Sequence, residues 1–170
     1  SSSVLLGDDS KNGWQIQYAL EFMMNTDAHL FPPRPNWEAD GYKPDEYGRW
    51  IKGDWQPRKS TGPAALDAPR WEIDPGIILS RDGSEWIREP ESEYIALPLY
   101  EGRMIGQFNF SQKGWVSGKG RGAVWREIPW ESKAIEPQYL IAESEWNERG
   151  TPACSYTKIA FMDVTSATNA

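Results

Sequence analysis

The feature that most restricts how this 170-residue chain can fold is a glycine-rich stretch at residues 110–126, which reads FSQKGWVSGKGRGAVWR. Glycine occupies positions 114, 118, 120 and 122 of this stretch. Glycine loses more backbone freedom on folding than any other residue, so four glycines this close together disfavour a helix and weaken a strand. The sequence therefore predicts a basic, glycine-rich loop here, with the regular elements of the chain on either side of it.

This predicted loop is basic, although the chain as a whole is acidic at a net charge of −7. Residues 102–126 contain five cations and no acid, and subtracting those five charges leaves −12 on the remainder of the chain. Cations can neutralise phosphates, and a tryptophan can stack on a base. A mobile loop that pairs with the acids of its own chain explains the same composition. The candidate DNA contacts are Arg103, Lys113, Trp115, Lys119, Arg121 and Arg126.

Composition narrows the class of protein. The chain has the length of one domain, with 39% hydrophobic and 25% charged residues. No apolar run is long enough for a membrane-spanning helix, and the N-terminus lacks the pattern of a secretory signal. The single cysteine excludes a disulfide within the chain and fits a reducing cytoplasm. With one histidine besides, the sequence offers too few ligands for a Cys/His zinc site.

Hydrophobic patterning predicts an α+β fold with a mixed or antiparallel sheet, few helices and long loops. Tyr100, Met104 and Phe108 recur every four residues, which predicts a helix over 98–107 with Pro98 in its first turn. Three prolines make residues 31–37 irregular, and residues 56–69 form a flexible loop. The other expected elements are strands at 14–21, 47–55, 139–142 and 156–164, a hairpin at 76–87 and a polar loop after 142. A turn or short helix is expected at 25–29, and a short helix ended by Gly41 at 35–41.

Two enzymatic activities, nucleotide hydrolysis and metal-dependent DNA cleavage, have little support in the sequence. Residues 114–120 resemble a phosphate-binding Walker loop, but the spacer is short and Gly120 stands where that motif needs a hydroxyl. A metal-dependent nuclease would need a convergent acidic cluster, for which Glu143, Glu145 and Glu148 are the candidates. A solvated acidic surface explains these three residues better.

Several segments resemble a known family in the same order along the chain. Residues 97–110, LPLYEGRMIGQFNF, resemble a segment of large bacterial DNA adenine methyltransferases of single-chain type II restriction–modification systems. Relatives of that family occur in phage-defence systems such as BREX and DISARM. Residues 22–31, FMMNTDAHLF, residues 137–145, PQYLIAESE, and residues 158–170, KIAFMDVTSATNA, resemble flanking segments of the same family. The sequence departs from the family pattern at Gly106, Asn109, Phe110 and Met162, so no role is carried over to these positions.

The resemblance implies a fragment that lies C-terminal to the catalytic domain of a larger methyltransferase. The parent protein would use S-adenosylmethionine, but the family's cofactor loop and Asn-Pro-Pro-Tyr tetrapeptide are absent from this sequence. The resemblance thus predicts a target-recognition module without catalysis or cofactor of its own, whose partners are double-stranded DNA and the catalytic domain of the same chain. The alternatives are a structural connector that packs on the catalytic domain, or a nuclease domain.

Overall fold

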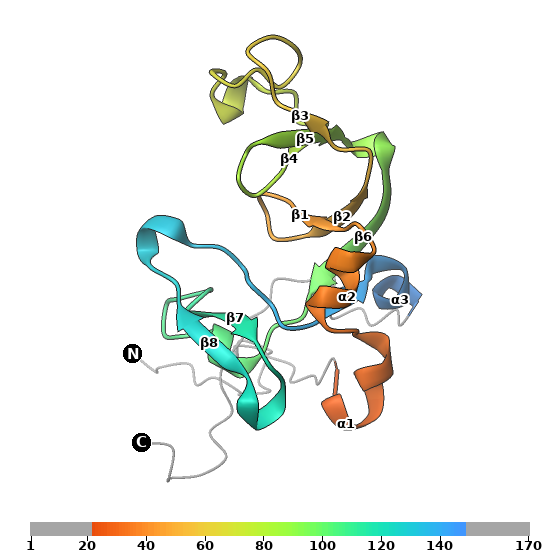
Figure 1. Cartoon of the computed structure of the whole chain (residues 1–170), viewed down its shortest axis with the longest axis vertical. Helices are drawn as coiled ribbons and strands as arrows, with labels where there is room; N and C mark the ends of the chain where they lie inside the picture. Colours follow the sequence, from red (N-terminus) through yellow and green to blue (C-terminus); the bar gives the residue numbers. More distant parts are fainter. Residues whose placement is uncertain (1–21, 149–170) are drawn as a thin grey trace, which may run out of the picture.

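The computed structural model describes residues 22–148, and the strands expected at 14–21 and 156–164 lie outside them. The fold is α+β, as the sequence predicts, with three short helices and antiparallel pairing throughout the named strands (Figure 1). No helix within these residues has the length and apolar character needed to cross a membrane.

The nine strands within residues 22–148 form three sheets. The largest has the order β1-β2-β6-β9, the second β3-β5-β4, and the third is the β7–β8 hairpin. Their bounds are β1 (Lys43–Pro44), β2 (Trp50–Gly53), β3 (Gln56–Pro57), β4 (Ile77–Leu79), β5 (Glu85–Arg88), β6 (Ser92–Pro98), β7 (Lys113–Ser117), β8 (Val124–Glu127) and β9 (Leu140–Ala142). The β2 strand, the β4–β5 hairpin and β9 confirm the predictions for 47–55, 76–87 and 139–142.

The main core lies between the two larger sheets. Ile51 of β2 packs with Ile78 of β4 and Ile87 of β5, and Trp55 closes the same cluster. An isolated bridge between Asp45 and Ser80 joins the sheets at one edge. Because side chains alternate along a strand, residues next to these in sequence point to the outer faces. Each buried isoleucine stabilises the fold by roughly 1.5–3 kcal/mol relative to an exposed one.

The outer face of the large sheet is covered by α2 (Arg34–Ala39), where Trp37 packs with Trp50. The expectation that residues 31–37 are irregular is therefore wrong for their second half, whereas the short helix expected at 35–41 is confirmed. Pro35 lies in the first turn of α2, where a missing N–H costs no helical hydrogen bond. The helix ends at Ala39, and Gly41, whose φ is +90°, follows its C-cap Asp40. The short helices α1 (Met24–Asp27) and η1 (Ala28–Leu30) confirm the prediction for 25–29.

The helix expected at 98–107 is absent from the structure. Strand β6 continues to Pro98 between β2 and β9, and a single 3₁₀ turn, η4 (Gly102–Met104), follows it. Met104 is fully buried, whereas Phe108 is 92% exposed and has a φ of +56°. The four-residue repeat therefore does not form one face, because pairing of β6 with two strands outweighs a short apolar repeat that contains two glycines.

The glycine-rich stretch contains the β7–β8 hairpin, so the prediction of a loop is wrong for its two ends. The turn between the strands carries Gly118 and Gly120, with φ values of +75° and +56°. A β-carbon at Gly118 would also overlap the carbonyl of Gly122. The glycines are thus concentrated in the turn, where their freedom is needed, and two strands are left to pair.

Residues 58–69 are irregular, as expected, but they make specific contacts. The Arg58 side chain donates from Nε to the carbonyl of Ala64 over 2.9 Å and from an Nη atom to that of Ala65 over 2.6 Å. Ala64 is buried against Ile73 and Ile77 on the outer face of the second sheet. Residues 58–69 therefore pack on the outer face of the second sheet, where the sequence predicted a flexible loop. After β9, α3 (Glu143–Glu148) replaces the predicted polar loop.

Candidate nucleic-acid interface

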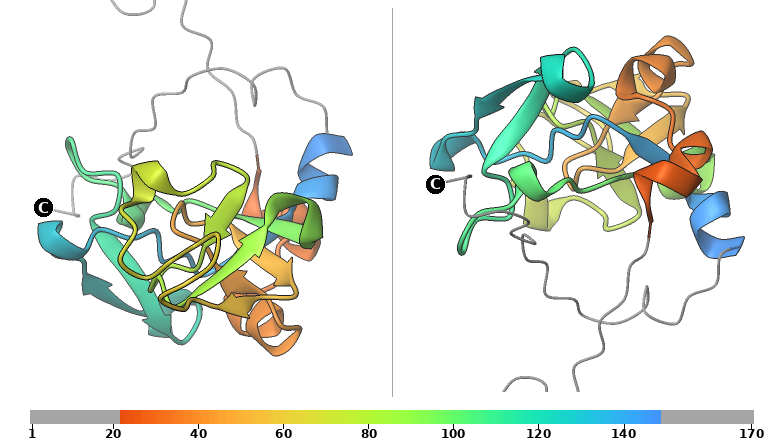
Figure 2. Two further views of the ribbon diagram at one scale, coloured as in Figure 1. Left: turned by 90° about the horizontal axis from the view of Figure 1, so that it is seen from above. Right: turned by 90° about the horizontal axis from the view of Figure 1, so that it is seen from below.

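The β7–β8 hairpin lies beside the two larger sheets and extends neither of them (Figure 1). Both views of Figure 2 show the hairpin and α3 on opposite sides of the molecule. The hairpin register pairs Gly114 with Arg126 and Trp115 with Trp125. The predicted basic and aromatic residues are therefore held on one small antiparallel frame.

A cleft of about 560 Å³ separates the hairpin from α2 and β1. Trp115 and Val116 of β7 form one wall, and Tyr42, Pro44 and Trp50 line the other. The charged residues that line it are the cations Arg34, Lys43, Arg81 and Arg126 and the carboxylates Glu38 and Glu136. Lys43 is also held by Glu85, whose Oε2 lies 2.6 Å from its Nζ. The lining is cationic even though the chain is acidic.

Arg34 is positioned by the hairpin. Its guanidinium carbon lies 4.7 Å from the centroid of the Trp115 ring, and an Nη atom donates to the Trp115 carbonyl over 3.4 Å. Its Nε lies 3.3 Å from a carboxylate oxygen of Glu38, but without the angle of a hydrogen bond. Burial lowers the pKa of Arg34, while the charges of Glu38 and Glu136 act in the opposite direction. Arg34 is therefore a partly desolvated cation on a rigid aromatic support.

Arg81 and Arg126 approach the cleft from two other elements. Arg81 follows β4 and donates to the carbonyl of Ile135 over 2.7 Å. Burial lowers the pKa of Arg81, and the charge of Glu136 is the main opposing influence. Arg126 of β8 forms an ion pair with Glu136. The carboxylate of Glu136 therefore pairs with Arg126, and its charge also raises the pKa of Arg34 and Arg81 against the effect of burial.

Trp50 also lines this cleft. The residue is 2% exposed, and its buried indole N–H has no hydrogen-bond partner among residues 22–148. Buried polar groups in native proteins are nearly always paired, so this donor is an exception within the part of the chain that the structure describes.

The six predicted DNA contacts do not all lie at one place in the structure. Arg126 and Trp115 line the cleft. Lys119 and Arg121 lie on the exposed turn of the hairpin, and neither has an ion-pair partner in the described part of the chain. Lys113 is half-buried at the start of β7, opposite Glu127. Arg103 lies over the ring of Trp125, with its guanidinium carbon 5.1 Å from the centroid.

Trp115 has little surface available for a base. It is 7% exposed, Arg34 covers its ring, and its indole N–H donates to the carbonyl of Gly118 over 3.0 Å. The expected stacking role of Trp115 therefore needs revision: in this conformation the ring supports Arg34 and fixes the hairpin turn. The side chain of Gln138 donates to the same Gly118 carbonyl over 3.2 Å, which ties the turn to the start of β9.

Sequence reasoning missed Arg34, Arg81 and Trp50. Arg34 lies among prolines that predict an irregular segment, and Arg81 belongs to an Arg-Asp-Gly-Ser turn that predicts only a hairpin. No local spacing connects them with residue 126. One feature of the sequence did point to the cleft, namely the lack of acids between residues 102 and 126. It indicated the hairpin, which forms one wall of the cleft.

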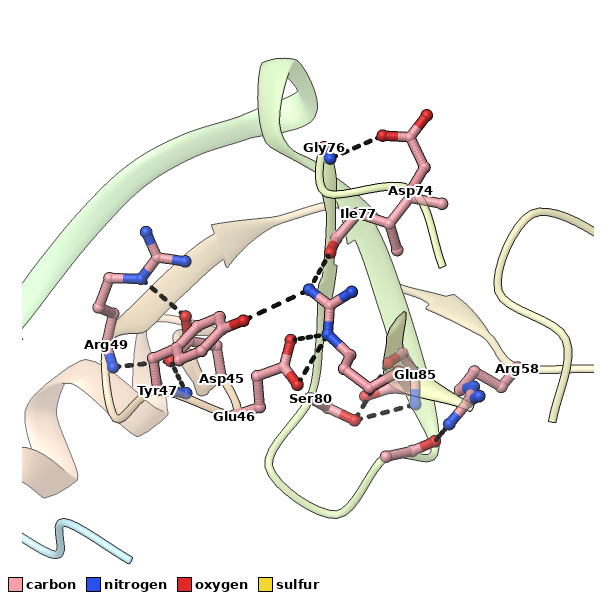
Figure 3. A network of polar contacts seen from close by, with 12 residues as sticks. Asp45, Glu46, Tyr47, Arg49, Arg58, Asp74, Gly76, Ile77, Ser80 and Glu85 are labelled. Carbon is pink, nitrogen blue, oxygen red and sulfur yellow. Dashed lines mark hydrogen bonds and ion pairs between the residues drawn. The ribbon is translucent and has the colours of Figure 1, made fainter. Parts of the chain in front are cut away.

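A second groove, of about 480 Å³, lies on the other side of the β1–β2 turn and is built differently. Buried Asp45 accepts hydrogen bonds from the backbone of Tyr47 and Arg49 and from Arg49 Nε, and Glu46 binds Arg70 (Figure 3). Each arginine of this groove is thus neutralised by a neighbouring acid. The groove therefore lacks the excess of cations that marks the first cleft.

Within residues 22–148, no group of three or more His, Cys, Asp or Glu side chains is arranged to hold a metal ion. Glu143, Glu145 and Glu148 lie along α3, so the nuclease alternative gains no supporting observation there. Comparison with protein-family models, curated proteins and solved structures gives no match to the chain.

Proposed function

We propose that this chain is a DNA-recognition module. Its β7–β8 hairpin and the adjoining cleft bind the phosphate backbone of duplex DNA. The observation that carries the proposal is the concentration of cations on one side of an acidic chain. Lys119 and Arg121 are exposed without ion-pair partners in the described residues, and the adjoining cleft is lined by Arg34, Arg81 and Arg126. Phosphate contacts of this kind supply most nonspecific affinity for DNA.

The parent protein, on the strength of the sequence resemblance, is a bacterial, cytoplasmic DNA adenine methyltransferase of a restriction–modification or phage-defence system. Its catalytic domain supplies S-adenosylmethionine chemistry, and the present chain supplies target contacts and performs no catalysis. The net charge of −12 outside residues 102–126 supports this division. An acidic remainder repels DNA from every surface except the basic one and so limits nonspecific adhesion.

The experiment that tests DNA binding is a salt series with the 170-residue chain and fluorescein-labelled duplexes of unrelated sequence. The double variant Lys119→Ala/Arg121→Ala is compared with Lys59→Ala/Arg88→Ala, which removes the same charge from exposed sites in residues 58–69 and on the second sheet. Each phosphate contact contributes about −0.9 to the slope of log K against log salt. We expect the hairpin variant to bind all duplexes more weakly and to lose about two units of slope.

The matched control should retain affinity and slope. Equal losses in both double variants would show that only total charge matters, and that outcome would contradict hairpin binding. Absence of binding by the unaltered chain at low salt would contradict the proposal as a whole.

The connector alternative is favoured by a different observation, a set of exposed aromatic residues near the hairpin. Phe108 and Trp130 are largely exposed, and Phe110 precedes Ser111, whose carbonyl binds Lys133. Lys133 Nζ also lies 4.7 Å from the Trp130 ring centroid, so Lys133 links Trp130 to the backbone next to Phe110. Exposed apolar patches mark surfaces that other domains cover. A connector should self-associate through this patch, and Phe108→Ser/Trp130→Ser should abolish that association in sedimentation velocity without changing DNA binding.

A further inference from the structure

We infer that the cleft beside the hairpin is a binding site for a single phosphate group, and that the Glu136 carboxylate occupies this site until a phosphate displaces it. The inference deepens the proposed function, on which it rests for the source of the phosphate, namely the backbone of nucleic acid.

The position of Glu136 among three arginines is the first argument. Arg126 pairs with the Glu136 carboxylate, Arg81 is bonded to the carbonyl of the preceding residue, Ile135, and Arg34 lies across the cleft on Trp115. A guanidinium fork matches the oxygen geometry of carboxylates and phosphates alike. A phosphate in the place of the Glu136 carboxylate would therefore meet the Arg126 guanidinium and lie within the field of Arg34 and Arg81.

The second argument is that cations outnumber carboxylates in the lining of the cleft. Glu38 is engaged by Arg34, so Glu136 is the carboxylate that the three guanidinium groups have in common. Arg34 and Arg81 are both partly withdrawn from water, and desolvation strengthens their attraction for an anion. A phosphate brings more oxygens than a carboxylate and can satisfy donors that one carboxylate leaves free.

Trp50 offers a means of observing the site. It belongs to the lining of this cleft, but its indole nitrogen is itself buried and has no hydrogen-bond partner within residues 22–148. A change of charge in the cleft should therefore alter the environment of this indole N–H without direct contact.

Gly114 provides the third argument, because it makes room for Glu136. A β-carbon at position 114 would lie 2.8 Å from the β-carbon of Glu136 and would overlap its carboxylate. The backbone N–H of Trp115 also donates to the Glu136 carbonyl over 2.9 Å. The carboxylate of Glu136 therefore lies directly against strand β7.

The first experiment uses inorganic phosphate and the 170-residue chain at constant ionic strength, with chloride as the balancing anion. The readout is the ¹H–¹⁵N signal of the Trp50 indole, assigned with Trp50→Phe. We expect this signal to shift on titration, and Glu136→Gln to bind phosphate about tenfold more tightly than the unaltered chain. Glu145→Gln, which makes the same change of charge on the far side of the molecule, should leave the phosphate affinity unchanged.

The second experiment repeats the duplex titration at 0.15 M salt with the same two variants. A gain of DNA affinity in Glu136→Gln but not in Glu145→Gln supports displacement by a backbone phosphate. If Glu136→Gln tightens phosphate but not DNA, the site serves free phosphate and its assignment to nucleic acid is overturned.

Failure of the phosphate site can be told apart from failure of the proposed function. If phosphate leaves the Trp50 signal unmoved in both the unaltered chain and Glu136→Gln, the site is refuted, and the hairpin test with Lys119 and Arg121 decides DNA binding separately. Thermal unfolding of each variant, monitored by circular dichroism, shows that the fold is retained.

Discussion

At the scale of single residues, tryptophan has two separate uses in this chain. Trp115 is buried between Arg34 and the hairpin turn, whereas Trp71 is 85% exposed on η2 (Arg70–Glu72). The same side chain therefore stabilises the fold in one position and contributes almost nothing in the other. Burial, and not residue type, decides the energetic consequence of a substitution.

This contrast predicts the effect of truncating each indole. Trp115→Ala removes a buried ring and leaves a cavity, so we expect the free energy of unfolding to fall by about 3 kcal/mol. Trp71→Ala should change it by less than about 0.5 kcal/mol, because little contact is lost. Urea denaturation followed by circular dichroism measures both, and similar losses would contradict the burial of Trp115.

Glu101 gives a prediction about pH. Burial raises the pKa of its carboxyl, which the charge of Arg103 only partly offsets, and Oε1 is buried without a hydrogen-bond partner in residues 22–148. A carboxyl whose pKa is higher in the folded state binds more protons there than in the unfolded chain. Stability is then lost as pH rises from the unfolded pKa through the folded pKa.

Glu101→Gln should remove this loss, since a neutral amide does not titrate. We expect the variant to be more stable than the unaltered chain at neutral pH and to show a flatter profile of thermal midpoint against pH over the acidic range. Glu93→Gln, at an exposed position of β6, is the matched control. An unchanged profile in Glu101→Gln would show that Glu101 ionises as freely when folded as when unfolded.

At the scale of elements, the close packing of the two larger sheets depends on a glycine in β2. A β-carbon at Gly53 would lie 2.6 Å from Ile87 Cδ1 and 2.8 Å from the carbonyl oxygen of Glu91, whereas one at Gly122 would meet nothing within 4 Å. Gly53→Ala should therefore destabilise the fold by roughly 1–3 kcal/mol through overpacking. Gly122→Ala should be neutral or stabilise by up to about 1 kcal/mol. Chemical denaturation of the two variants distinguishes the sites, and equal stabilities would contradict the packing of Gly53.

Local sequence patterns correctly predicted the elements that short-range interactions determine. The β4–β5 hairpin follows from two apolar runs that flank an Asp-Gly turn, and α2 ends shortly before Gly41, the glycine that the pattern marks. The helix expected at 98–107 is absent because β6 pairs with strands β2 and β9, which are distant in sequence. The cleft beside the hairpin could not be predicted for a similar reason. Arg34, Arg81 and Arg126 belong to a helix, a turn and a separate hairpin, and only tertiary packing brings them to one cleft.

At the scale of the whole molecule, two charged regions of opposite sign lie on opposite sides. The hairpin and cleft are rich in cations, and α3, with Glu143, Glu145 and Glu148, lies on the far side in both views of Figure 2. Salt screens exposed charges over about 30 Å at 0.01 M but over about 8 Å at 0.15 M. The acids of α3 can therefore weaken DNA binding only through the long-range field, whereas Glu136 acts within the cleft itself.

Repulsion of DNA by the α3 carboxylates should therefore depend on salt more strongly than repulsion by Glu136. The triple variant Glu143→Gln/Glu145→Gln/Glu148→Gln should raise affinity for duplex DNA at 0.01 M salt, because three repelling charges are removed within the Debye length. At 0.15 M the advantage should vanish, while that of Glu136→Gln should persist. Fluorescence anisotropy at the two salt concentrations compares the variants directly. An advantage of the triple variant that survives at 0.15 M would mean that DNA lies close to α3, and the binding face would then have to be moved away from the hairpin.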